Sequence, residues 1–344
     1  MNSFKTGLVG IMVANPQQRK RVLGQYLRHN TTNMKLFSFT PSSIDWKKNT
    51  VVGLHRSNRK WVVRRFPLPH VVYNRCYGTN HEIIERLEAA IGSDKCFNHL
   101  NQFNKLEIYQ RLGRWLSDHL PETVAYDPNA AVHMLDKHKV IYFKPVFGHQ
   151  GKGVYRVELN HAGEIHIGHH YFSPQTIVND FSAFQASMQE LLGVTPYIIQ
   201  EGVDIRKINN QTFDIRALVQ KNDRGTWSVT NLVSRIASKG SYNTSIYEKA
   251  CLSQDVLKRL VPLENVNGIV RSIYDISLRS AEIIDTETDY HMGEFSVDIA
   301  LDDNAHAWII ELNGKPQKEL YQGIRKQTAV YTRPMQYAQY LCKR

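Results

Sequence analysis

Two acidic side chains and a carboxamide near the C-terminus have the types and spacing of a metal-binding site. Asp298 lies in an apolar strand-like run, Glu311 lies in the next such run, and Asn313 follows two residues later. Carboxylate and amide oxygens are the ligands that suit a Mg²⁺ ion already holding the phosphates of a nucleotide. Because apolar residues flank both acids, we interpret them as a magnesium site rather than as solvent-facing acids of an amphipathic hairpin.

Whether these side chains meet depends on the register of two strands, predicted at Phe295 to Leu301 and Ala307 to Leu312. An even-numbered loop between them, either two or four residues long, would place the two acids directly opposite each other. An odd-numbered loop would not. Side chains alternate between the faces of a strand, so Asn313 would share the face of Glu311. The candidate even loops are Asn304-Ala305 and Asp303 to His306.

A second candidate site is the stretch KPVFGHQGKG, which joins two strand-like runs. Lys144 stands among apolar residues, where its ammonium must reach the surface or pair with an anion such as phosphate. Gly148, Gly151 and Gly153 permit positive φ and let backbone N–H groups approach a polyanion, while Lys152 adds charge. The Walker and dinucleotide fingerprints both open a helix, whereas this stretch leads into a strand. The pattern favours a flexible hairpin that covers phosphates.

A helix start precedes this stretch. Asn104 followed three residues later by Glu107 resembles a capping box, and apolar residues then recur at helical spacing. Lys105 takes the first helical position, where a cation opposes the helix dipole. Its presence there indicates either a nearby anion or an exposed position at which the dipole matters little.

The elements that must position these residues alternate between strands and helices. Up to the soft boundary near Phe97, the pattern predicts an α/β domain, residues 1–97, with a hairpin and two helices. Its predicted elements are the strand TGLVGIMV, the helix QQRKRVLGQYLRHN, the strand KLFSFTP, the hairpin VVGLHR with KWVVRRFP, the strand HVVYNRCY and the helix HEIIERLEAAIG. The last segment, IRKQTAVYTRPMQYAQYLCKR, predicts an amphipathic helix broken at Pro334.

Composition bounds the class of protein. The 344 residues carry 43 Lys and Arg against 32 Asp and Glu, with a pI of about 9.4. The densest basic cluster, RSNRKWVVRR, interleaves apolar residues and indicates a strand with a charged face, and no nucleic-acid motif accompanies it. Four cysteines without paired spacing argue against disulfides and zinc. Without a membrane segment or signal pattern, we expect a cytoplasmic protein that binds neither nucleic acid nor membrane.

Other chemically notable residues carry weaker predictions. His166, His169 and His170 cluster in a hairpin-like insertion where no carboxylate or cysteine completes a metal-ligand set, so we interpret them as surface residues. Arg75 ends an apolar strand and indicates either an anionic substrate across a cleft or a simple salt bridge. No serine has a histidine and an acid at suggestive spacing.

Taken in order, these motifs resemble an ATP-grasp domain: a strand lysine before a glycine-rich hairpin, the strand YIIQEGVDI, the segment FDIRALV, and an Asp separated by twelve residues from Glu-x-Asn. GLVGIMV, PHVVYNR, FNHLNQFNKLEIYQRL, LPET and ELNGKPQ resemble the YheC/YheD family of endospore coat-associated ATP-grasp proteins, over nearly the whole chain. The resemblance implies a pre-ATP-grasp-like α/β domain at 1–97 and an α+β ATP-grasp fold at 98–344, whose subdomains 121–203 and 204–344 clamp the nucleotide.

The resemblance also implies roles for individual residues toward ATP and Mg²⁺. Lys105 and Lys144 would hold phosphates under a loop that includes Gly148, Gly151, Lys152 and Gly153, and the adenine would meet Gln200, Glu201 and Val203. Asp298, Glu311 and Asn313 match the metal ligands, and Arg216, Arg235 and, less closely, Asn243 match positions that steady the transferred phosphoryl group.

The implied activity is carboxylate–amine ligation through an acyl phosphate, on an unidentified carboxylate or other anionic substrate and with a role in spore coat formation. SYNTSIYEKA departs from the family at the acceptor side, because a glycine pair is common there. The alternative is therefore a nucleotide-binding structural or assembly protein of the spore coat that has no ligase reaction and docks acidic coat components.

Overall fold

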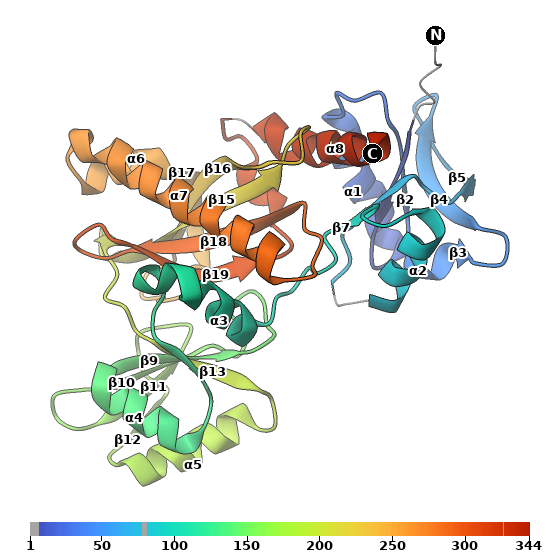
Figure 1. Cartoon of the computed structure of the whole chain (residues 1–344). Coiled ribbons are helices and arrows are strands. Elements are labelled where there is room, and N and C mark those ends of the chain that lie inside the picture. The colour runs from blue at the N-terminus through green and yellow to red at the C-terminus, as the bar shows by residue number, and fades with distance from the viewer. Residues whose placement is uncertain (1–6, 78–80, 326) are drawn as a thin grey trace.

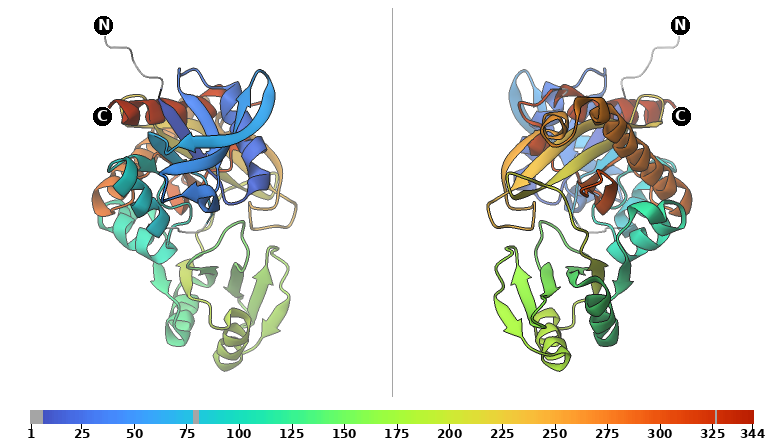
Figure 2. Two further views of the ribbon diagram at one scale, coloured as in Figure 1. Left: turned by 90° about the vertical axis from the view of Figure 1, so that its right-hand side faces the viewer. Right: turned by 90° about the vertical axis from the view of Figure 1, so that its left-hand side faces the viewer.

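A computed structural model describes residues 7–77, 81–325 and 327–344. The chain forms three β-sheets with helices packed against them (Figure 1). The sheet within residues 121–203 projects away from the other two and occupies the lower end of all three views (Figures 1 and 2).

The N-terminal sheet has seven strands, of which the central ones are parallel and alternate with helices. Helix α1 starts where the Asn15 side chain accepts from the Gln18 N–H at 3.2 Å and Pro16 presets the first turn. The strands, in spatial order, are β3 (Ile44–Asp45), β4 (Thr50–Ser57), β2 (Lys35–Phe39), β1 (Leu8–Met12), β6 (Val71–Asn74) and β7 (Cys96–Phe97), with β5 (Lys60–Pro67) paired to β4. The helices are α1 (Pro16–Arg28), the short η1 (Pro41–Ser43) and α2 (His81–Ile91). The predicted α/β order of this region, including its hairpin, is confirmed.

The second sheet is antiparallel and carries two helices that cover one small apolar core. Asp127 and Asp180 cap these helices by accepting backbone N–H groups, as short acidic side chains do at helix starts. The strands, in spatial order, are β12 (Thr176–Val178), β11 (Ile165–His169), β10 (Tyr155–Leu159), β9 (Val140–Pro145), β13 (Tyr197–Glu201) and β8 (Thr123–Ala125), and the helices are α4 (Pro128–His138) and α5 (Phe181–Leu192). Strands β9 and β10 form the predicted hairpin around the glycine-rich stretch.

The third sheet is also antiparallel, and its central strands β15 and β18 are buried almost throughout. Long apolar helices cover one of its faces and build the largest core. The strands, in spatial order, are β17 (Tyr247–Leu252), β16 (Trp227–Ala237), β15 (Gln211–Lys221), β18 (Glu294–Leu301) and β19 (Ala307–Asn313), with β14 (Lys207–Ile208) on β15. The remaining helices are α3 (Lys105–Leu116), η2 (Ser117–His119), α6 (Ser253–Leu260), α7 (Leu263–Glu287), η3 (Lys318–Tyr321) and α8 (Gln327–Lys343).

The C-terminal helix α8 joins the first and third sheets. Its apolar side chains share one buried cluster with residues of α1, β1, β6, β15 and β16, and α8 lies beside α1 in Figure 1. The first domain and the third sheet therefore pack together through one shared apolar core, whereas the second sheet has a separate core.

The prediction that this helix breaks at Pro334 is wrong, because α8 is continuous from Gln327 to Lys343. A proline inside a helix removes the N–H that would bind the carbonyl four residues earlier. That carbonyl, on Val330, accepts instead from the Lys318 ammonium and from the Gln220 side-chain amide, each at 3.0 Å. Tertiary donors thus replace the missing helical bond.

Candidate active site

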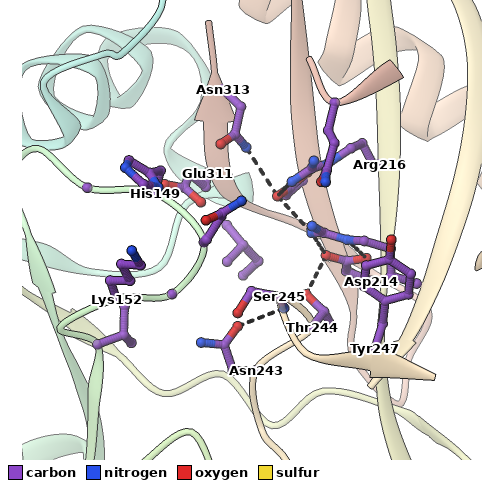
Figure 3. A pocket seen from close by; sticks show the side chains of 18 of the residues that line it. His149, Lys152, Asp214, Arg216, Asn243, Thr244, Ser245, Tyr247, Glu311 and Asn313 are labelled. Carbon is purple, nitrogen blue, oxygen red and sulfur yellow. Dashed lines mark hydrogen bonds and ion pairs between the residues drawn. The ribbon is translucent and has the colours of Figure 1, made fainter. Parts of the chain in front are cut away.

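A cavity of about 810 Å³ lies between the second and third sheets and reaches the first domain. Figure 3 shows its polar side chains converging from β19, β15, the glycine-rich loop and the loop after β16. Nearly every predicted site residue lines it: Lys105, Lys144, Gly148, Gly151, Lys152, Gln200, Glu201, Val203, Arg216, Arg235, Asn243, Asp298, Glu311 and Asn313. Gly153 is the exception, since it packs against Tyr197 and Pro145 behind the loop.

The glycine-rich loop between β9 and β10 contacts the opposite wall of the cavity. Gly151 has φ +68°, and a Cβ built there would lie 2.0 Å from Nδ2 of Asn243 and 2.7 Å from the Ser245 hydroxyl. Only glycine fits both the backbone angle and this close approach. Asn243 is fixed in turn, because its Oδ1 accepts from the Ser245 N–H at 2.8 Å. The loop therefore lies against the β16–β17 connection.

Two lysines enter the cavity from different elements. The Lys105 ammonium, at the first position of α3, lies 3.1 Å from the Glu311 carboxylate. A cation at the start of a helix is unfavourable, and the nearby Glu311 carboxylate offsets this cost for Lys105. Lys144, on β9, donates to the side-chain oxygen of Gln200. Burial lowers the pKa of Lys144 to about 8, and the neighbouring Lys105 charge acts in the same direction. An added anion would restore its usual pKa.

A chain of alternating charges crosses the face of the third sheet. Arg216 binds Asp298 through two N–H groups at 2.7 and 2.6 Å, and Arg235 binds the same carboxylate at 2.9 Å. Arg235 also forms a two-point contact with Asp214. Burial raises the pKa of Asp298, but the two guanidinium groups outweigh it and hold that pKa at about 2. The four side chains thus form a charge-balanced network at 4 to 6% exposure.

Asp298 and Glu311 face each other across the hairpin of β18 and β19, but the register that pairs them differs from the predicted one. Cross-strand pairing places Asp298 opposite Glu311, as expected, but Leu301 pairs with Ala307, so the loop between the strands holds an odd number of residues. A bulge between Asp298 and Ile299 shifts the register by one and restores the facing pair. The even-loop prediction is wrong. The extra residue, Ile310, turns its carbonyl toward α3, where the Tyr109 hydroxyl donates to it.

The strand β13 carries the residues predicted to meet a base. Gln200 is buried and bridges Lys144 and the Thr123 hydroxyl. Val203 lines the cavity. The Glu201 carboxylate lines it too, yet it accepts from the Glu122 N–H at 3.0 Å. A base amine would have to share that carboxylate with this backbone N–H.

Comparison with known sequences identifies the family to which this chain belongs. A family model described as YheC/D like ATP-grasp matches residues 93–341. The chain belongs to this ATP-grasp family. The endospore coat-associated protein YheD of Bacillus subtilis (strain 168) is 23% identical over 308 residues, covering 85% of this chain and 67% of YheD. The endospore coat-associated protein YheC of the same organism is 24% identical over 345 residues, covering 90% of this chain and 88% of YheC.

Solved structures agree on the architecture. The ATP-grasp ligase PsnB, complexed with a minimal precursor, Mg and ADP, superposes with a TM-score of 0.55 at 14% identity, and 98% of each chain is covered. At that identity the likeness shows the fold, which is the ATP-grasp fold. The family and the fold expected from the sequence are confirmed. Across the ranges that the structure describes, no helix is both long and apolar enough to cross a membrane.

The donors at the β18–β19 hairpin fit the magnesium ion that ATP-grasp proteins use. Asp298, Glu311 and Asn313 offer carboxylate and amide oxygens on one face, the donor set that Mg²⁺ prefers. Asn313 donates its Nδ2 to Asp298 at 3.2 Å, so its Oδ1 points away from that contact (Figure 3). Lys105 and the two arginines neutralise the carboxylates that a cation would otherwise balance.

Sequence reasoning missed several residues of this ATP-grasp cavity. Asp214 stands two residues before Arg216 on β15, a period that signals a shared strand face, and Thr244 donates to it at 2.7 Å. Lys315 and Tyr77 line the far end, where nothing in their local patterns signals a site. Arg75 pairs with Glu294 at 2.9 Å, so the salt-bridge interpretation is confirmed. Arg75 also lines the cavity, where its contact with an anionic substrate stays a prediction.

The histidine cluster is divided between surface and cavity. His166 pairs with Glu164 at 3.1 Å on the surface of β11. His170 lines the cavity and its ring centroid lies 3.7 Å from that of His169. The prediction that all three are surface residues is thus wrong for His170.

Proposed function

We propose that this ATP-grasp chain is an ATP- and Mg²⁺-dependent ligase that joins a carboxylate to an amine through an acyl phosphate. The observation that supports it most is the convergence of two lysines, two arginines and three oxygen ligands on one cavity beneath a glycine-rich loop. These groups come from β9, α3, β15, β16, β18 and β19, so local sequence alone would not assemble them. Phosphoryl transfer needs such positioned charges more than it needs a nucleophile supplied by the protein.

The residues divide into two tasks. Lys144 and Lys105 would hold phosphate oxygens, and backbone N–H groups from Gly148 to Gly151 would cover them. Asp298, Glu311 and Asn313 would hold Mg²⁺, which would offset the negative charge of the phosphates. Arg216 and Arg235 point from the neighbouring strands toward the same space, where they would stabilise the charge that spreads over the transferred phosphoryl group.

The proposed reaction conserves atoms and charge in two steps. A substrate carboxylate oxygen attacks the γ-phosphorus, the bond to the β-phosphate oxygen breaks, and ADP leaves. The amine nitrogen of a second substrate then attacks the acyl carbon, the carbon–oxygen bond to phosphate breaks, and phosphate and a proton are released. The chain's part is to hold the reactants in line and to exclude water, which the closed contact between Gly151 and Asn243 favours.

The setting of the reaction is inferred from the relatives. YheC and YheD are named as endospore coat-associated, and we propose that this chain acts in the cytoplasm on components destined for the spore coat.

A nucleotide-binding assembly protein without ligase activity is the second candidate. The β16–β17 connection favours it, because it carries bulky residues instead of a glycine pair and fills the space against the loop.

Calorimetric titration of ATP, with and without Mg²⁺, tests the nucleotide site. We expect Mg²⁺-dependent binding that Lys144→Ala and Glu311→Gln weaken, while Lys258→Ala on α6 behaves as the native protein. ADP release on adding a panel of carboxylates and amines then separates the two candidates: turnover supports the ligase, and binding without turnover supports the assembly protein. No binding to the native protein would contradict both.

A further inference from the structure

The active-site cavity continues into a groove on the first domain. A second hollow of about 740 Å³ lies along α1, bounded by the β4–β5 hairpin, η3 and the start of α8. It shares Arg21, Gln25 and Glu319 with the active-site cavity. The two hollows therefore meet at these three residues, and a polypeptide lying in the groove could enter the cavity.

The groove is lined by cations that lack acidic partners. Lys20 and Arg28 on α1 and Arg56 on β4 are exposed, and within the described ranges none of them forms an ion pair. The one acidic side chain of the lining, Glu319, is held by Arg21 at 3.3 Å. The groove consequently has a surplus of positive charge that an extended anion would neutralise.

The shape of the groove suits an extended polypeptide. Lys20 and Arg28 belong to a helical stripe, and eight residues at a rise of about 1.5 Å separate them by about 12 Å. That distance equals about four residues of extended chain. Between them Gly24 presents no side chain, and a Cβ there would lie 3.8 Å from the Trp61 ring. The Trp61 ring therefore lies over Gly24, between cations that side chains of an extended polypeptide could reach.

The end of the cavity nearest the groove also has unbalanced positive charge. The Lys315 ammonium lies 3.7 Å from the centroid of the Tyr77 ring, and no carboxylate among the described residues pairs with it. Arg75 shares the single Glu294 carboxylate with the buried Lys318, and its Nε is buried without a hydrogen-bond partner. A carboxylate placed here would find two cations facing it.

We propose that the carboxylate substrate is a side chain or terminus of an acidic polypeptide, which lies in the α1 groove and extends past Arg21 to Lys315 and Arg75. This inference rests on the ligase function proposed above. An acidic polypeptide fits better than a nucleic acid because the proposed reaction begins at a carboxylate, which nucleic acids lack. Charge complementarity would both attract such a chain and fix which segment reaches the phosphoryl group.

Binding of a labelled octaglutamate peptide tests the groove, with octaglutamine as the uncharged probe of equal length. Fluorescence anisotropy is measured on the Mg²⁺- and ATP-analogue-loaded protein at low and at physiological ionic strength. We expect the native protein to prefer octaglutamate, and the Arg28→Glu/Arg56→Glu variant to bind it about tenfold more weakly. Lys258→Glu/Arg259→Glu on α6, across the molecule from α1 in Figure 1, makes the same change of charge outside the groove and should leave binding unchanged.

Calorimetry of ATP on the same variants separates the two proposals. ATP bound normally, with no preference for octaglutamate or no effect of the groove variant, would overturn this inference and leave the ligase proposal intact. Loss of ATP binding in the native protein would overturn both. A labelled oligonucleotide that binds more tightly than octaglutamate, and loses affinity only in the groove variant, would also overturn it in favour of a nucleic-acid surface.

A Lys315→Gln variant should weaken the binding of octaglutamate while leaving ATP affinity within about twofold, which places the peptide at the cavity as well as in the groove.

Discussion

The two ends of the cavity balance their charges in opposite ways. At the end where we propose that ATP binds, the nucleotide end, Arg216 and Arg235 are matched by Asp298 and Asp214, and Lys105 is matched by Glu311. Lys144 is the exception there, because it donates to the Gln200 side chain and not to a carboxylate. At the acceptor end, formed with the first domain, the cations outnumber the carboxylates available to them. The nucleotide end is organised before any ligand arrives, whereas the acceptor end is left to be completed by an anion.

The difference follows from burial. A buried ion costs several kcal/mol unless it is paired, so fully buried charges appear in matched sets. Lys315 reaches solvent in part, and among the described residues no carboxylate pairs with it.

The largest effect is expected from the carboxylate that anchors the acceptor end. Glu294 is fully buried between Lys318 at 2.7 Å and Arg75 at 2.9 Å. Glu294→Gln leaves both cations without their counter-ion and should lower the free energy of unfolding by roughly 3–5 kcal/mol. Urea unfolding measures the change, with Glu264→Gln on the exposed surface of α7 as the control. A loss under about 1 kcal/mol would show that Lys318 does not need this partner.

At the nucleotide end the same substitution should act on the reaction instead of the fold. Glu311 is part-exposed, so Glu311→Gln is expected to fold normally and to lower the rate of ADP release by about 10²–10³-fold. Glu319→Gln removes an equal charge from the acceptor end and should change the rate by less than about tenfold. Equal losses of the rate of ADP release in the two variants would contradict the difference between the two ends.

Acid should first loosen the junction between the first domain and the third sheet. His291 lies at the junction of the first domain and the third sheet, with Glu88, His99, Tyr337 and Lys221 around it. Burial lowers its pKa from 6.5 to about 4, with contributions from the charges of Lys221 and His99. The unfolded chain therefore takes up the proton first, and stability is lost as pH falls from about 6.5 toward 4, by up to about 3 kcal/mol.

The nucleotide network should persist through that range, because the pKa of Asp298 is held at about 2. Hydrogen exchange at pH 7, 5 and 4 should show α8 losing protection before β15 does, and His291→Gln should flatten the dependence. Simultaneous loss in both elements would contradict the separation of the two ends.

The smallest effect concerns the loop that closes the nucleotide end. Gly151→Ala adds a methyl group that collides with Asn243 and imposes strain at φ +68°, so the loop should open and ATP should bind about tenfold more weakly. Gly163→Ala provides a matched control, because that glycine has φ +85° but no neighbouring atom within 4 Å. If Gly163→Ala weakens ATP binding as much as Gly151→Ala does, backbone strain alone, without the collision with Asn243, explains the loss of affinity.

Much of this site was readable along the chain. The strand lysine Lys144, the glycines of the loop and the acidic residues of the β18–β19 hairpin follow from residue type and spacing. The turn of the β18–β19 hairpin did not, because a bulge moves the register by one without leaving a local signal. The continuity of α8 across Pro334 was also hidden, since the donors that satisfy Val330 lie on β15 and η3.

The sequence alone was enough to predict the order of strands and helices, the glycine-rich hairpin and most residues of the cavity, because these depend on short-range periodicity and residue chemistry. Only the tertiary structure decided how the charges pair. Asp214 meets Arg235, and Glu294 meets Lys318 and Arg75, across separations that no local pattern records. The surplus charge at Lys315 and along α1 emerges the same way, since a cation is unpaired only in relation to every carboxylate that folding brings near it.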